Sequence, residues 1–174
     1  MQRLAPIFAA VLLGLAATQS PAQTHAQMDH EHMAMAPDTR RELDFPPMAR
    51  AHMLGNMRSH FIALQEILAA LAAGDGARAG KVARDRLGAS SPNAAACVKP
   101  KSDGGMSHAD MGAMMAHFMP DEMRALGLTM HESADAFADV AEKLAPAGDL
   151  RPAVAALAQV TQNCAACHAA YKLR

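Results

Sequence analysis

Three long stretches of the chain carry apolar residues at alternating spacings of three and four. In the stretch between residues 47 and 73 these positions are Leu54, Met57, Phe61, Leu64, Leu68 and Leu71. In a later stretch a large apolar residue recurs every seven positions, at Met123, Met130, Phe137 and Leu144. This period draws one apolar stripe along a helix and is typical of helices that pack together lengthwise. It favours a helical fold, and no stretch shows the alternation of a β-strand.

Glycine and aspartate mark the expected ends of the helices. Gly74 ends the first helix, and Asp75 and Asp149 can cap the second and the last. The expected helices cover residues 47–73, 76–87, 108–118, 121–145 and 150–174. Short loops between long helices indicate antiparallel neighbours. The prediction is an all-α fold, an antiparallel four-helix bundle.

The C-terminal stretch holds Cys164-Ala165-Ala166-Cys167-His168, the signal for attachment of c-type haem. Two thiols bond to the two vinyl groups of one porphyrin, and the adjacent imidazole can reach the iron. Residues three and four apart lie on one helix face, about 5–6 Å apart, so the three side chains point the same way. The alternatives are a redox disulfide, which belongs near a βαβ pattern, or half of a zinc site, which needs a second ligand pair.

The motif continues the apolar spacing of the last helix. The positions in that register are Leu150, Val154, Leu157, Thr161, Cys164, His168 and Tyr171. Cys164 and His168 therefore lie on the predicted seam. The bundle is thus predicted to carry a covalently bound haem c on its C-terminal helix, and this cofactor should face the bundle interior.

Composition supports a small-side-chain core and excludes one class of partner. The chain is 51% hydrophobic and 19% charged, has a formal net charge of -1 and contains only 3% aromatic residues. Ala, Leu and Met must fill the core, which favours helices. No basic stripe of the kind that binds nucleic acid is present.

The first residues indicate export. A short basic start, an apolar run from Leu4 to Ala17 and small residues after it predict a secretory signal peptide over residues 1–26, cleaved after Ala22 or Ala26. The run is too short for a membrane anchor. Residues 27–46 are expected to be a flexible His/Met-rich segment, and residues 47–174 the bundle. The predicted location is the periplasm, where c-type haem is attached.

Sulfur and imidazole groups also gather outside the haem motif. The stretch from His25 to Met35 and the segment from Met106 to Met123 are rich in Met and His. Thioethers select Cu(I), so a copper-binding protein is one alternative function. The alternatives are a soluble tail for the first and a Met-lined core face for the second. Cys97 is an odd thiol that forms an intermolecular disulfide or stays solitary.

These features resemble the cytochrome c′ family, the class II c-type cytochromes, over about Arg50 to Arg174. The resemblance rests on the Cys164–His168 motif near the C-terminus, followed by Tyr171-Lys172, and on Met57-Arg58-Ser59-His60-Phe61 in the first long helix. It implies one covalent haem c in a four-helix bundle. The short second helix and the Met106–Met123 segment depart from the family pattern.

The resemblance also implies roles for individual residues. Cys164 and Cys167 would form the thioethers and His168 would be the proximal ligand. Met57 would be the sixth ligand or the side chain that blocks its place. Arg50 and Lys172 would be cations near the haem, Lys172 one helical turn after His168. His60, off the seam, and His117 are poorer candidates for the sixth position.

Two functions follow from such a centre. Ligation by Met57 would suit electron transfer with redox partner proteins, as in Met/His cytochromes. An empty sixth position would let the iron bind a small gas such as nitric oxide or carbon monoxide. No spaced catalytic constellation is present, so no enzymatic activity and no catalytic residues are predicted. A homodimer through an exposed face of the first helix is a further expectation from the family.

Overall fold

The computed structural model describes residues 37–97, 114–145 and 148–174, and the structural account concerns these alone. They contain four α-helices and little strand, so the prediction of an all-α fold is confirmed. The predicted signal peptide and the Met/His stretch from His25 to Met35 lie outside the described residues.

The first two helices begin and end where the sequence predicted. Helix α1 spans Pro47–Ala72 and has its proline in the first turn, where a missing N–H is tolerated. It stops because Gly74 adopts a φ of 72°, a left-handed conformation that favours glycine. Helix α2 spans Gly76–Leu87, and the carboxylate of Asp75 accepts a hydrogen bond from the Arg78 N–H at 2.9 Å. Asp75 therefore caps α2 as expected.

The other two long helices deviate slightly from the predicted limits. Helix α4 spans Asp121–Ala141 and is four residues shorter than expected. Helix α5 spans Arg151–Ala170. Its N-cap is Leu150 and not Asp149, although the Asp149 carboxylate still accepts from the Arg151 N–H at 3.0 Å. Aspartate thus stabilises the first turn of α5 from one position earlier than predicted.

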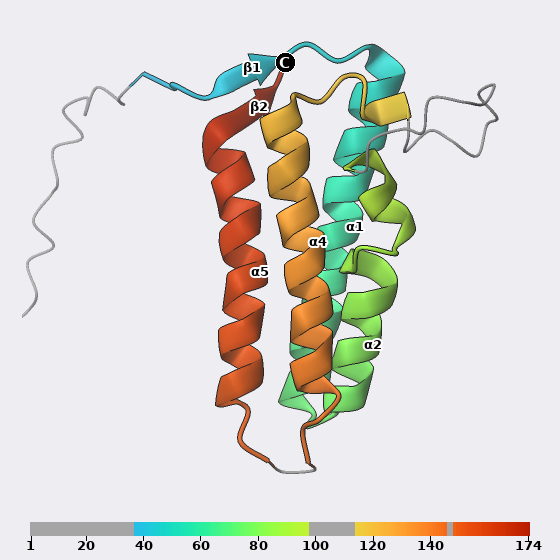
Figure 1. Ribbon diagram of the computed structural model, residues 1–174, viewed down its shortest axis with the longest axis vertical. Helices are drawn as coiled ribbons and strands as arrows, with labels where there is room; N and C mark the ends of the chain where they lie inside the picture. The colour runs from blue at the N-terminus through green and yellow to red at the C-terminus, as the bar shows by residue number, and fades with distance from the viewer. Residues whose placement is uncertain (1–36, 98–113, 146–147) are drawn as a thin grey trace, which may run out of the picture. The chain divides into compact units, whose positions relative to one another are not determined.

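The helices lie side by side and pack in chain order, α1 on α2, α2 on α4, and α4 on α5 (Figure 1). Alanine supplies most of their shared core, at Ala63, Ala70, Ala79, Ala83, Ala134, Ala138, Ala141 and Ala153. Small side chains let backbones approach closely: a Cβ on Gly80 of α2 would lie 3.0 Å from the Ala138 carbonyl oxygen of α4. Helices α1 and α5, in contrast, are not closely packed against each other.

The predicted seam of α1 is wrong by about one residue. Phe61 is 75% exposed and Leu68 is 56% exposed, although both were expected inside. The residues that α1 buries are Ala49, Met53, His60, Ala63, Ile67, Ala70 and Leu71. In α5, likewise, Val154 and Thr161 are exposed while Ala153, Leu157 and Val160 are buried. In α4, by contrast, Met123, Met130 and Phe137 are buried as predicted. Large residues alone do not mark the buried faces of α1 and α5, because this core is built on alanine.

Two short strands were not anticipated. Strand β1, Arg41–Leu43, pairs in parallel with β2, Tyr171–Leu173, and joins the two ends of the described chain (Figure 1). Tyr171 therefore leaves the helix that was predicted to continue through it. Leu43 and Phe45 are buried, and the compact unit begins at Asp38. The expected start of the folded domain at residue 47 is thus too late, because these two apolar side chains anchor the preceding segment.

The segment before α4 contributes methionines to the interior. Residues 98–113 lie outside the described residues, and with them most of the predicted helix 108–118; Met114 and Met115 are helical and turns follow. Met115, Met119 and Met123 are buried in an apolar cluster with Leu43 and Phe45. These three methionines therefore line a core face, which was the alternative to copper binding for this segment.

Between α2 and Cys97 the chain forms a 3₁₀ helix, Pro92–Ala96, which has Cys97 at its C-terminal end. In the part of the chain that the structure describes, no helix is both long and apolar enough to cross a bilayer.

Candidate functional site

The Cys-x-x-Cys-His motif lies in the last turns of α5. Cys164 and Cys167 are half-buried, and His168 is exposed. All three side chains line the same cavity. The spacing of three and four on an unbroken helix directs both thiols and the imidazole toward one volume. The prediction that His168 lies on an inward-facing seam is not met, because its side chain is exposed.

The cavity has a volume of about 780 Å³, within the range of about 300–1,000 Å³ usual for small-molecule and cofactor sites. Its walls come from α1, α4 and α5, and it lies where α1 and α5 are not packed closely together. The apolar side chains that line it include Met53, Leu54, Met57, Phe61, Leu64, Met119, Met123, Leu126 and Met130. The arrangement offers an apolar chamber bordered by two thiols and an imidazole.

Helix α1 presents two candidate ligands to this chamber, Met57 and His60, one turn apart. Met57 is half-buried and also borders a surface groove formed with Leu54, Arg58, Phe61 and Ile62. His60 is only 8% exposed, and its Nε2 atom is buried without a hydrogen-bond partner. The prediction that His60 lies off the inward face is therefore wrong. Counting Ala63 and Ala70 as core residues would have placed His60 on the buried stripe.

A second buried histidine, which sequence reasoning missed, contacts His60. The rings of His60 on α1 and His131 on α4 meet edge to face, with 5.5 Å between their centroids. His131 is 1% exposed, and its Nδ1 lies 2.6 Å from the carbonyl oxygen of Leu87. That oxygen belongs to the last residue of α2, where helix carbonyls lack partners within the helix. His131 therefore completes the end of α2, packs against His60 and itself lines the cavity.

Burial keeps both imidazoles neutral. Loss of solvent, with smaller contributions from charge repulsion by His131 and His168, lowers the pKa of His60 to about 4. Burial also lowers the pKa of His131, against the opposing effect of its hydrogen bond to Leu87. A neutral imidazole keeps a lone pair on one nitrogen, which is the form that binds a metal.

The three cysteines of the chain form no disulfide. Burial raises the pKa of the Cys164 and Cys167 thiols, and it raises the pKa of Cys97 to about 11, with a smaller contribution from Cys167. These are protonated thiols and not activated thiolates. Cys97 also lines the cavity, which its solitary position in the sequence did not suggest.

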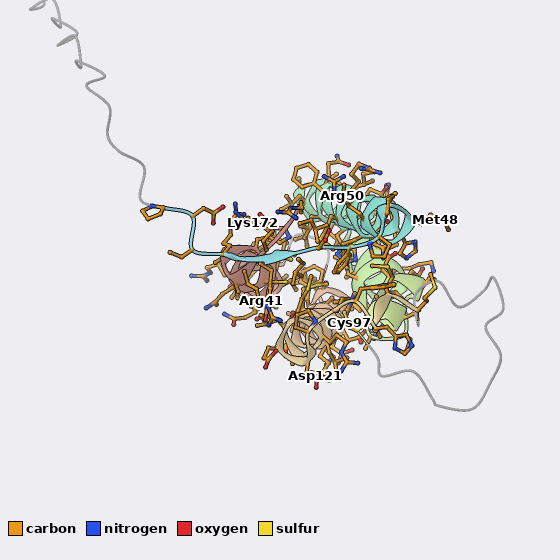
Figure 2. All side chains as sticks on the ribbon, turned by 90° about the horizontal axis from the view of Figure 1, so that it is seen from above. Arg41, Met48, Arg50, Cys97, Asp121 and Lys172 are labelled. Carbon is orange, nitrogen blue, oxygen red and sulfur yellow. The ribbon has the colours of Figure 1, made fainter. Side chains whose placement is uncertain are left out.

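Cationic side chains lie at the end of the molecule that carries the strand pair. Figure 2 looks down on this end, where Arg50 of α1 and Lys172 of β2 are labelled. Arg50 donates from Nε to the backbone oxygen of Arg174. Lys172 lies 3.3 Å from an Asp38 carboxylate oxygen and 3.6 Å from one of Glu42. Both cations border the cavity, but Lys172 lies in a strand and not in a helical turn after His168.

The residues present fit a covalently attached haem. Two thiols with their adjacent imidazole, an apolar chamber, a buried unpartnered imidazole nitrogen and cations at one end are the groups such a cofactor would engage. Within residues 37–97, 114–145 and 148–174, no three His, Cys, Asp or Glu side chains are grouped to hold a metal ion. A haem iron takes only one or two protein ligands, so that finding does not bear on haem. His117 is exposed and does not border the cavity.

Comparisons with protein-family models, with curated proteins and with solved structures give no match to this chain.

Proposed function

We propose that this chain is an exported monohaem c-type cytochrome of the cytochrome c′ type, and that it transfers electrons through a His-ligated haem iron. The observation that carries the proposal is the convergence of Cys164, Cys167 and His168 on one apolar chamber of about 780 Å³. A disulfide or zinc motif would not need an adjacent chamber of this size.

The fold supports the same proposal. The pairwise packing of α1, α2, α4 and α5 is that expected of an antiparallel four-helix bundle. The first and last helices, which would be neighbours in such a bundle, are not closely packed next to the motif. In a chain with 3% aromatic residues, the core side chains leave this space unfilled, and a porphyrin is the large apolar group that would fill it.

Each part of the chamber has a role in this proposal. Bound there, haem would supply an iron centre that alternates between the ferrous and ferric states. Cys164 and Cys167 would hold it through thioethers, and His168 would be the proximal ligand. The apolar lining would exclude water. Arg50 and Lys172 would offset the negative charge of the carboxylate groups of the porphyrin. Helix α1 offers Met57 and His60 for the sixth coordination position.

An exposed apolar surface on α1 suggests a protein contact. Phe61 and Ile62 are 75% and 49% exposed and border the groove that also includes Met57. Large apolar groups exposed together mark interaction sites more often than single ones do. This groove would serve a second copy of the chain or a redox partner.

The experiment is the absorption spectrum of protein exported to the periplasm, in the ferric and ferrous states, with and without carbon monoxide. A c-type spectrum whose ferrous form is low-spin and unchanged by carbon monoxide supports an electron carrier. High-spin iron that binds the gas readily would reject the carrier in favour of a gas-binding protein. Absence of a haem spectrum would reject both.

A matched control is the variant in which Cys164 and Cys167 are both replaced by Ser. It keeps His168, Met57 and His60 but removes both sites of covalent attachment. We expect this variant to lose haem during denaturing purification, whereas the parent protein retains it.

A further inference from the structure

His60 is a polar side chain in a place where polar side chains need a partner. Only 8% of the residue is exposed, and its Nε2 atom makes no hydrogen bond. Leaving a buried polar group unpaired carries a cost in stability. The neighbouring His131 does not relieve this cost, because the two rings meet edge to face and the Nδ1 of His131 is used by the Leu87 carbonyl.

The position of His60 identifies what could satisfy it. His60 lines the cavity from α1, and His168 lines it from α5. These two helices border the same chamber without packing closely against each other. Two imidazoles therefore line one chamber from different walls, and both could contact a metal centre held in it.

Met57 fits that role less well. It lies one turn before His60 on α1 but is only half-buried, and it also borders the surface groove with Phe61 and Ile62. A thioether is a weak hydrogen-bond acceptor, so leaving it without a ligand costs little. The unpaired imidazole has the stronger requirement for a partner.

We propose that His60 Nε2 would be the second protein ligand of the haem iron, so that two imidazoles would hold the centre, His168 from α5 and His60 from α1. This inference rests on the proposed covalent haem. Imidazole is an established ligand for iron, and His60 Nε2 is buried beside the chamber without another partner. His131 acts as a positioning residue, because its ring packs against His60 and is itself fixed by Leu87.

The test compares exported wild-type protein with His60→Leu and with the matched control Met57→Leu from the adjacent turn. Haem per chain is measured first, by the pyridine haemochrome assay. The spin state of the ferric iron is then measured by electron paramagnetic resonance. We expect low-spin iron in the wild type, loss of most of the low-spin signal in His60→Leu, and its retention in Met57→Leu. Carbon monoxide should bind the ferrous form of His60→Leu only.

The outcomes are distinguishable. The inference would be overturned in favour of Met57 if both variants have normal haem content, His60→Leu keeps low-spin iron, and Met57→Leu loses the low-spin signal. High-spin iron in the wild type would overturn it while leaving the haem proposal intact. A wild type without haem would defeat the proposed function itself, and the inference with it.

Two further measurements keep the inference testable if His60→Leu folds poorly. The near-infrared magnetic circular dichroism of the wild type distinguishes two imidazoles from an imidazole with a thioether, and needs no variant. In His60→Gly, added imidazole should restore the low-spin signal. A thioether signature in the wild type would refute ligation by His60.

Discussion

Replacement of His131 by Leu should remove a hydrogen bond that closes the end of α2. The imidazole Nδ1–H donates to the Leu87 carbonyl at 2.6 Å, and the side chain is 1% exposed. Leucine preserves apolar contact but leaves that carbonyl unpaired in the interior, at a cost of about 1–3 kcal/mol. We expect His131→Leu to lower the free energy of unfolding by this amount near neutral pH.

The assay is urea unfolding followed by far-ultraviolet circular dichroism. With a slope of about 2 kcal/mol per M, a loss of about 2 kcal/mol lowers the unfolding midpoint by about 1 M. His117 is exposed and serves as the control, since His117→Leu should change stability by less than about 0.5 kcal/mol.

The pH dependence gives a second reading of the same contact. Burial lowers the pKa of His131 in the folded protein, whereas in the unfolded chain it is about 6.5. Below that pH the unfolded state binds more protons, so stability falls as pH decreases. His131→Leu should lose less stability than the wild type between about pH 7.5 and pH 5. The variant should still lose some stability as pH decreases, because it keeps His60, whose pKa is lowered to about 4 in the folded protein. Equal stability and an equal pH dependence in both proteins would refute the reasoning.

Three other substitutions test the packing and the surface. Phe137→Ala empties a fully buried site and should cost about 3–5 kcal/mol in urea unfolding; a loss below 1 kcal/mol would contradict that burial. In Gly76→Ala the new Cβ would collide with the Ala141 carbonyl oxygen of α4, which should lower the free energy of unfolding by about 1–3 kcal/mol. In Gly55→Ala the nearest atom to the new Cβ is 3.9 Å away, so this variant should stabilise α1 by about 0.5–1 kcal/mol. Phe61→Ser should change stability by less than about 0.5 kcal/mol and weaken self-association in sedimentation, and a wild type that is monomeric at all concentrations would contradict the second part.

Local signals predicted the helices well. Gly74 ends α1 through its left-handed backbone and Asp75 caps α2, and both effects depend on only a few neighbouring residues. The heptad of Met123, Met130 and Phe137 gave the buried face of α4 correctly because that face does contain its large residues.

Other features depend on tertiary structure and could not be read from spacing. The partner of β1 is about 130 residues away along the chain, and three-residue strands have almost no pattern of their own. Alanine carries too little hydrophobic contrast to mark the buried stripe of α1, so His60 was assigned to the wrong face. The positions of His131 and Cys97 beside the chamber likewise arise only when α4 packs on its neighbours.

The predicted site residues also divide into those placed by a regular helix and those placed by tertiary structure. The motif on α5 and the opposing Met57 were brought to one cavity because each lies on a long regular helix. Lys172 reaches the same cavity from a strand, held by Asp38 and Glu42, which a helical extrapolation past Ala170 could not foresee.

Covalent attachment is the claim on which the proposed function depends, and the intact mass of the denatured, exported protein measures it directly. We expect a mass higher than that of the processed chain by one haem, with Cys97 open to alkylation and Cys164 and Cys167 blocked. A mass equal to that of the polypeptide alone, with all three thiols alkylated, would contradict the account.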